Sequence, residues 1–98
     1  MRLQGAALAV REAAEAYDAG AAPKEVGRLA NTAKYLASEA ANAVADHAMQ
    51  VHGGYSFATE YHIGRHWIEL RPHRIAPVSN QMVLNFMSEK VLGLERSY

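Results

Sequence analysis

The stretch from Gln50 to Tyr61 brings together residue types that could take part in chemistry: an amide, two adjacent glycines, aromatic rings and a carboxylate. The glycines, Gly53 and Gly54, follow a long alanine-rich segment with helical spacing. Because glycine adopts positive φ at little cost, the pair suits a helix end and leaves backbone amides unobstructed. A large, flat or charged group can approach such an end closely. A glycine pair is also an ordinary stop signal, so the pattern alone leaves both interpretations open.

Two of the histidines have the spacing of metal ligands. His62 and His66 are four residues apart and would share one helix face, which is the geometry of two zinc ligands. No Cys, Asp or third His at ligand spacing accompanies them, and Glu69 is better placed as a solvated partner. We therefore expect no metal site. His47 and His52 flank the expected helix end, where we expect half-buried hydrogen-bonding groups.

The sequence contains no complete catalytic motif. Ser56 lies in a Gly-Tyr-Ser-Phe loop without a nearby base, and the Gly-x-Ser-x-Gly elbow of Ser-His-Asp hydrolases is absent. The P-loop and the dinucleotide fingerprint are absent too. The residues alone therefore predict no self-contained catalytic site.

The chain of 98 residues (1–98) is long enough for a single domain with a modest core. This length is near the size at which a chain depends on partners to bury its apolar surface. Ten acidic and ten basic residues cancel, so the basic footprint of a nucleic-acid-binding protein is missing. The absence of Cys excludes disulfides and fits a reducing compartment. No run approaches the ~18–20 apolar residues of a membrane span, and the N-terminus lacks a signal-peptide pattern. We expect a soluble, cytoplasmic chain.

Apolar residues recur at helical spacing in four segments, and no strand-like alternation occurs. The expected helices are Leu3–Tyr17, a helix of about 28 residues beginning at Pro23, Tyr61–Leu70, and a last helix that Ser79 caps and Gly93 ends. We expect an all-α fold, an up-down four-helix bundle in one domain. The short third helix makes a weak wall, so apolar surface should remain for another domain or subunit.

The same period predicts which side chains are buried. In the first helix the expected face consists of Leu3, Ala7, Val10, Ala14 and Tyr17. In the third helix it consists of Ile63, Trp67 and Leu70. Alanine occupies most buried positions of the second helix, which lets a neighbouring helix approach closely. Because no capping residue precedes the first helix, we expect the chain to be part of a longer protein.

The sequence from Gln50 to Tyr61 resembles the signature of a known family. It is similar to the Q-x-x-G-G-x-G-F-x-x-E-Y motif in the C-terminal helical domain of acyl-CoA dehydrogenases. The resemblance implies that Gln50, Gly53 and Gly54 meet the adenosine diphosphate half of FAD that belongs to a neighbouring subunit.

The resemblance continues without gaps into the last helix. It places Ser79 and Gln81 at positions that, in the family, help to hold the flavin end of FAD. A hydroxyl at the start of a helix can donate to the flavin or its phosphates, and the backbone amides there can do the same. Ser79 can also simply cap its helix, and the two roles are compatible.

Five residues depart from the family pattern. Pro77 stands where the family usually has the glutamate that removes the α-proton of the acyl thioester, and proline cannot accept a proton. Val78 replaces the following glycine, Ser56 replaces the third glycine of the loop, and Ile68–Glu69 replaces an Arg-Asp pair. Three explanations are open: a base on an earlier helix, a subunit that supports an active partner, or different flavin chemistry.

The resemblance implies a fatty acid metabolism enzyme that oxidises acyl-CoA to 2,3-enoyl-CoA with FAD and passes electrons to an electron-transfer flavoprotein. It also implies a homo- or hetero-oligomer, a dimer or tetramer. The domain alone should be inactive, because the missing parts supply the other walls of the flavin site. The alternatives are a non-catalytic subunit of a heteromeric dehydrogenase, and a structural helical module that binds partner helices and no cofactor.

Overall fold

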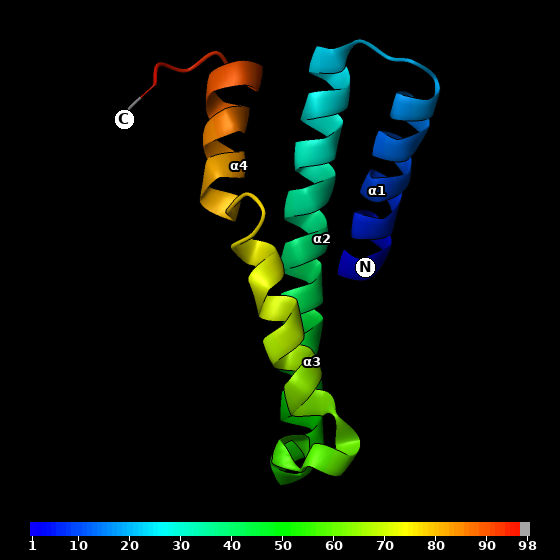
Figure 1. Ribbon diagram of the computed structural model, residues 1–98, viewed down its shortest axis with the longest axis vertical. Coiled ribbons are helices and arrows are strands. Elements are labelled where there is room, and N and C mark those ends of the chain that lie inside the picture. The colour runs from blue at the N-terminus through cyan, green and yellow to red at the C-terminus, as the bar shows by residue number, and fades with distance from the viewer. Residues whose placement is uncertain (97–98) are drawn as a thin grey trace.

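The computed structural model describes residues 1–96, and Ser97 and Tyr98, the end of the expected domain, lie outside the described residues. The described part is mostly helical and contains no strand (Figure 1). The α-helices are α1 (Arg2–Asp18), α2 (Pro23–His52), α3 (Ile63–Leu70) and α4 (Asn80–Phe86). Short 3-10 turns η1 (Gly53–Phe57) and η2 (Thr59–Tyr61) lie between α2 and α3, and η3 (Arg71–Arg74) lies between α3 and α4. A π-helical turn η4 (Met87–Val91) extends α4. The predicted all-α class with four helices is confirmed.

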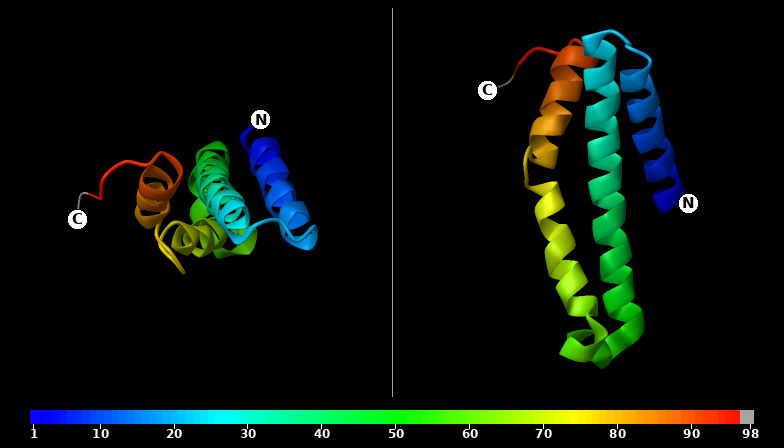
Figure 2. Two further views of the ribbon diagram at one scale, coloured as in Figure 1. Left: turned by 90° about the horizontal axis from the view of Figure 1, so that it is seen from above. Right: turned by 45° about the vertical axis from the view of Figure 1, so that its right-hand side comes forward.

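The helices form three columns, with α2 in the middle. α1 packs on one side of α2, while α3 and α4 follow one another along the other side (Figures 1 and 2). α1, α3 and α4 all run antiparallel to α2, so the up-down alternation stops at α3. The reason is the link between α3 and α4: the turn after Pro72 shifts the chain sideways but does not reverse it. The bundle is therefore open and elongated, with extents of 47 × 34 × 22 Å.

The helix boundaries follow the signals in the sequence with one exception. Pro23 is the first residue of α2, and Gly53, with φ 56°, ends it after 30 residues. The Ser79 hydroxyl accepts a hydrogen bond from the Met82 amide at 3.3 Å, which confirms the predicted N-cap of α4. The third helix begins later than predicted, because His62 adopts a left-handed conformation (φ 57°) and separates Tyr61 from α3.

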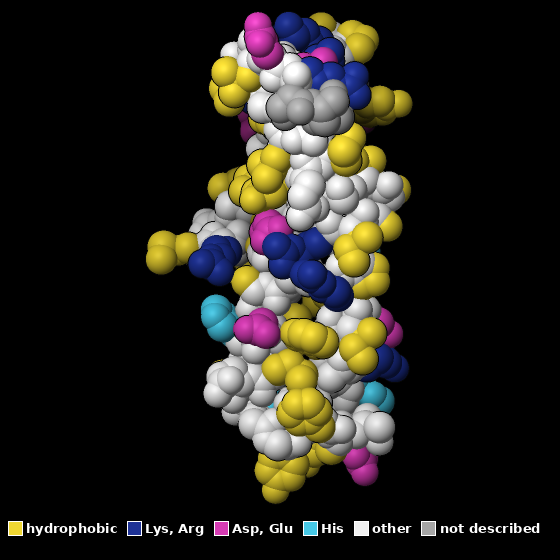
Figure 3. All heavy atoms as spheres, turned by 90° about the vertical axis from the view of Figure 1, so that its left-hand side faces the viewer, with side chains coloured by type: hydrophobic (Ala, Val, Ile, Leu, Met, Phe, Trp, Pro, Cys, Tyr) yellow, Lys and Arg dark blue, Asp and Glu magenta, His cyan; other side chains and the backbone are white. Residues whose placement is uncertain are grey.

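The hydrophobic core is small. Its buried apolar residues are Ala6, Leu29, Ala33, Ala40, Ala45 and Val83. The radius of gyration is 16.2 Å, against about 13 Å for a compact domain of this length. The accessible area is 7191 Å², against about 5,500 Å² for a compact protein of 10.7 kDa. Apolar surface therefore remains uncovered, as predicted. Figure 3 shows hydrophobic side chains over the whole height of one face.

The predicted buried face of α1 is wrong. Leu3 is 56% exposed, Tyr17 is 72% exposed, and Val10 is exposed too. Alanines on the neighbouring face lie against α2 instead, at positions Ala6, Ala9, Ala13 and Ala16. Small side chains let the two helices approach closely, and the helical period cannot show which of two apolar faces a partner covers.

The predicted face of α3 is only partly buried. Ile63 and Leu70 are half-buried, whereas Trp67 is exposed. The cause is the open arrangement, because α3 contacts α2 on one side and has no helix of this chain on the other within residues 1–96.

Candidate functional site

The glycine end of α2 is an exposed surface without side-chain bulk. Gly53 and Gly54 are both exposed, and a Cβ atom added to either would meet no other atom within 4 Å. The Gly53 amide, however, donates to the Gln50 and Met49 carbonyls and so closes the last turn of the helix. The expectation that the glycine amides are unobstructed is therefore wrong for Gly53. What this helix end offers is an open surface that a flat group can contact.

Ser56 closes the loop below this helix end. Its side chain is 1% exposed, and its hydroxyl donates to the Gly53 carbonyl at 2.6 Å. Gly64, near the start of α3, lies directly against the Ser56 carbonyl. The serine that replaces the third glycine of the signature thus stabilises the loop.

Aromatic and histidine side chains surround the same end of the molecule. The rings of Tyr55 and Tyr61 meet edge to face, with centroids 5.5 Å apart, and both residues are exposed. Phe57 is 80% exposed. His52 makes a hydrogen bond to the Ala48 carbonyl through Nδ1 (2.9 Å), but both His52 and His47 are exposed, so the prediction that they are half-buried is wrong.

The second group of predicted site residues lies at the start of α4. The Ser79 hydroxyl accepts from Met82, which leaves its own proton free to be donated. Gln81 is exposed, and so is Pro77 in the preceding turn. A hollow of about 290 Å³ lies beside this turn. Its lining consists of Lys34, Ala37, Ser38, Ala41, His73, Ala76 and Pro77. No Asp or Glu of the described chain lines it.

The structure does not bring the two groups of predicted site residues together. Asn80 hydrogen-bonds Ser38 of α2, which places the start of α4 at the level of that residue. Gln50 lies twelve residues further along α2, which corresponds to about 18 Å at ~1.5 Å per residue. The two groups can therefore contact only different parts of one extended ligand, or two different molecules.

Sequence reasoning missed a buried polar cluster beside the second of these groups. Asn80 is 4% exposed, and its amide donates to Ser38 Oγ at 2.9 Å and to Glu39 Oε1 at 2.7 Å. Its oxygen accepts from Lys34 Nζ. The signal was present in the sequence: Lys34, Ser38 and Asn42 form a polar stripe at four-residue spacing on an otherwise alanine-rich helix. Asn42 continues the stripe, because it donates to the Leu70 carbonyl at 3.0 Å.

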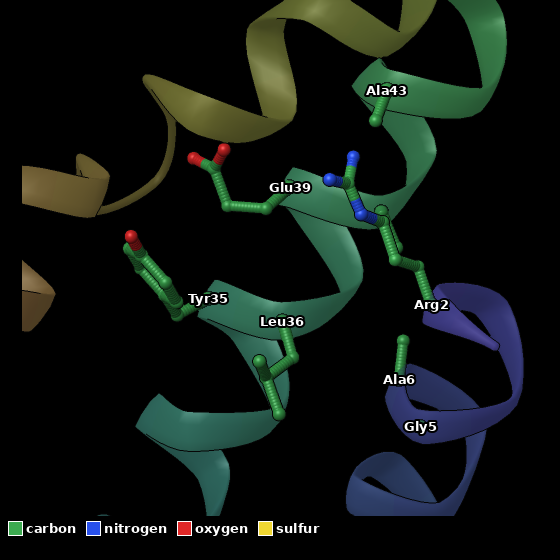
Figure 4. Close-up of a pocket in the computed structure, with 8 residues that line it drawn as sticks. Arg2, Gly5, Ala6, Tyr35, Leu36, Glu39 and Ala43 are labelled. Carbon is green, nitrogen blue, oxygen red and sulfur yellow. The ribbon is translucent and has the colours of Figure 1, made fainter.

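A separate hollow of about 460 Å³ lies between α1 and α2. Figure 4 shows that the Arg2 side chain reaches across it toward α2, while Tyr35 and the Glu39 carboxylate point away from α1. Its other lining residues are small or aliphatic. None of the predicted site residues lines this hollow.

No group of three His, Cys, Asp or Glu side chains within residues 1–96 is arranged to hold a metal ion. His66 Nδ1 lies 3.5 Å from Glu69 Oε2, which is the solvated pairing expected for Glu69. Within residues 1–96, none of the helices combines the length and the apolar composition that a membrane span requires.

The fold and the exposed helix end define a helical domain with much uncovered apolar surface. The family model described as "Acyl-CoA dehydrogenase, C-terminal domain" matches residues 1–92. The chain belongs to the acyl-CoA dehydrogenase family, and it corresponds to the C-terminal domain.

Three relatives illustrate this membership. The chain is 42% identical over 95 residues to acyl-CoA dehydrogenase FadE12 of Mycobacterium tuberculosis, a match that covers 95% of this chain and 24% of that protein. It is 33% identical over 81 residues to the caffeyl-CoA reductase-Etf complex subunit CarC of Acetobacterium woodii (83% of this chain, 21% of that protein). It is 33% identical over 63 residues to the mitochondrial long-chain specific acyl-CoA dehydrogenase of Sus scrofa (64% and 15%). The chain thus spans about a quarter of the length of FadE12. No solved structure matches it.

Proposed function

We propose that this chain is the C-terminal domain of a longer, FAD-dependent acyl-CoA dehydrogenase. In this proposal Gln50, Gly53 and Gly54 contact the adenosine diphosphate half of FAD bound to a neighbouring subunit. The observation that carries it is the open end of α2, where neither glycine has an atom of the chain in the space that a side chain would fill. FAD, when bound, supplies the acceptor for the hydride that leaves the acyl chain.

The residues at this end fit a nucleotide. Gln50 is exposed on the last turn of α2, and its carboxamide offers both donors and an acceptor for a ribose or a phosphate. Gly53 and Gly54 contribute surface, because the Gly53 amide is already bonded within the helix end. Gln50 is therefore the group that we expect to orient the nucleotide, and the glycines are the groups that admit it.

Ser79 and Gln81 form the second contact region, which we assign to the flavin end of FAD. The Ser79 hydroxyl retains a proton to donate while it caps α4, and the Gln81 side chain is exposed. The separation of about 18 Å along α2 supports an assignment in which the two regions serve distant parts of the dinucleotide or the FAD molecules of two subunits.

The base that accepts the α-proton of the substrate must be a residue other than the one at position 77. Pro77 has no group that accepts a proton, and the titratable side chains that line the adjacent hollow are Lys34 and His73. Glu39 follows Ser38, which lines this hollow, but the Glu39 carboxylate is bound by Arg74 Nε at 2.8 Å and by Asn80. We propose that the base lies on a helix that precedes this chain in the whole protein, or in a partner subunit that this chain supports.

The proposed reaction is the oxidation of an acyl-CoA to its 2,3-enoyl form. We propose an electron-transfer flavoprotein as the electron acceptor, and the name of the Acetobacterium relative, a subunit of a reductase-Etf complex, supports a partner of this kind. The uncovered apolar surface supports assembly into an oligomer with other domains or subunits.

The test compares the whole protein with a double variant. The whole protein should be purified yellow, with the flavin band at about 450 nm, and Gln50→Ala with Gly54→Val should lose most of that absorbance. A matched control is Gln4→Ala with Gly5→Val, which changes the same residue types at exposed positions of α1. If the whole protein is colourless and the double variant alters only thermal stability, the structural helical module is the better description.

A further inference from the structure

The link between α2 and α4 depends on one polar side chain. Every side-chain hydrogen bond that the structure shows between these two helices within residues 1–96 involves Asn80. The amide group meets Lys34 and Ser38 through its oxygen, and Ser38 and Glu39 through its nitrogen. Asn80 is also almost completely buried, at 4% exposure.

The partners of Asn80 are themselves held in place. Glu39 Oε1 accepts from Arg74 Nε at 2.8 Å as well as from Asn80 Nδ2. The Ser38 hydroxyl lies 3.0 Å from the Tyr35 carbonyl, its neighbour on α2. Within residues 1–96, no buried side-chain polar atom lacks a partner. A network that is satisfied in this way fixes one arrangement, because any shift of Asn80 leaves buried polar groups unpaired.

The remaining contacts of α4 with α2 are apolar. Val83 is buried to 1% exposure, and the Phe86 ring approaches Gly27. The stabilisation that such contacts provide is roughly proportional to the buried area and has little directional preference. They hold α4 against α2, but they do not determine its rotation or its position along α2. The hydrogen bonds of Asn80 are directional, and they act on the residue that lies between Ser79 and Gln81.

We infer that Asn80 is the positioning residue for the contacts of Ser79 and Gln81 with the flavin end of FAD. This inference rests on the proposed function. Asn80 itself touches no cofactor, because its amide is used up by Lys34, Ser38 and Glu39. It sets where the residues before and after it lie.

The test is made in the whole protein with Asn80→Ala and, as a matched control on the same helix, Asn85→Ala. The Asn85 side chain has only a weak contact, 3.9 Å to Met82 Sδ. Asn80→Ala should alter the visible circular dichroism of the bound flavin and raise the Kd for FAD about tenfold, as expected if the misplaced Ser79 or Gln81 loses one hydrogen bond to the flavin end. Asn85→Ala should leave both unchanged. Far-UV circular dichroism shows whether each variant is folded.

A rescue variant separates positioning from general destabilisation and covers the case in which Asn80→Ala does not fold. Asn80→Asp alone places two carboxylates together and should perturb the flavin signal. Asn80→Asp with Glu39→Gln keeps the net charge and reverses donor and acceptor. In the wild type Arg74 and Asn80 share Glu39 Oε1, so the glutamine must turn to donate through its nitrogen to Asp and accept through its oxygen from Arg74. This double variant should recover most of the wild-type flavin spectrum.

The outcomes are distinguishable. A colourless wild-type protein would overturn the proposed function and this inference with it. A yellow wild type overturns the inference alone if a folded Asn80→Ala keeps the native flavin spectrum and affinity, since Asn80 then only stabilises the fold. A double variant that is no better than Asn80→Asp also contradicts it.

Discussion

Gly64 and Ser56 approach so closely that a Cβ atom added to Gly64 would lie 2.9 Å from the Ser56 carbonyl oxygen. The start of α3 can therefore pack on the η1 loop only without a side chain. Because the obstructing atom belongs to the backbone, either α3 or the loop must shift to admit a methyl group. We predict that Gly64→Ala lowers the free energy of unfolding by about 1–3 kcal/mol, measured by urea denaturation of the 98-residue chain.

Gly27 provides the matched control. It lies inside α2, and a Cβ there would meet only the Phe86 ring, at 3.9 Å, which is an ordinary contact. Gly27→Ala should raise the free energy of unfolding by about 0.5–1 kcal/mol. Equal effects of the two substitutions would contradict the close approach at Gly64.

Adjacent alanines of α1 test which of its faces packs on α2. Ala6 is 7% exposed and lies in the contact between the helices, whereas Ala7 is exposed. Ala6→Leu should overfill this contact and cost about 1–3 kcal/mol, and Ala7→Leu should change stability by no more than about 0.5 kcal/mol. Thermal unfolding followed by circular dichroism measures both. A larger loss for Ala7→Leu would restore the face predicted from the sequence.

Glu25 and Arg28 in the first turns of α2 predict a pH effect. Two hydrogen bonds from Arg28, of 3.0 Å (Nε to Oε2) and 2.5 Å (Nη2 to Oε1), lower the pKa of the Glu25 carboxyl below its ordinary value. A carboxyl whose pKa is lower in the folded chain adds stability above its unfolded pKa, and this stability is lost as the pH falls through the folded pKa. The contribution is therefore complete at neutral pH and disappears in acid.

An NMR titration of the Glu25 side-chain carboxyl measures this shift. Arg28→Gln should bring the pKa of Glu25 back up toward its ordinary value, whereas Lys24→Gln should change it much less because Lys24 makes no hydrogen bond to Glu25 in the structure. An unchanged titration curve in Arg28→Gln would show that the pair does not form in solution.

The sequence predicted the elements that local signals determine. Pro23 and Gly53 mark the two ends of α2, and the Ser79 hydroxyl caps α4, because each of these residues acts on its own backbone. The likeness of the Gln50–Tyr61 signature to the family was also sufficient to identify the family.

The sequence did not predict features that depend on contacts between helices. The helical period of α1 selected Leu3 and Tyr17, but the closer fit of the alanine face places Ala6 against α2. The Asn80 cluster was missed for the same reason. The partners of Asn80 lie on α2, far from it in the sequence, and only α2 shows a polar stripe. α3 and α4 run in the same direction because of the path of the link after Pro72. The spacing of apolar residues predicts helices but does not predict the path of a link between them.

The two glycines at the end of α2 should differ in their effects on stability. Gly53 has φ 56° and ψ −136°, a conformation that strains any residue with a Cβ, so Gly53→Ala should cost about 1–3 kcal/mol. Gly54 has no positive φ and no neighbour in the space of its missing side chain. Gly54→Ala should therefore be close to neutral, and chemical denaturation of both variants of the chain checks this. A large cost at Gly54 would mean that its surroundings are filled.

This difference makes Gly54 the clean probe of the central claim, that the bare end of α2 receives FAD. The decisive measurement is the FAD content of the whole protein carrying Gly54→Val, read as the ratio of the absorbance at about 450 nm to that of the protein. The account predicts that this ratio falls several-fold while the variant remains folded and assembled like the wild type. A variant that keeps its full complement of FAD would contradict the account.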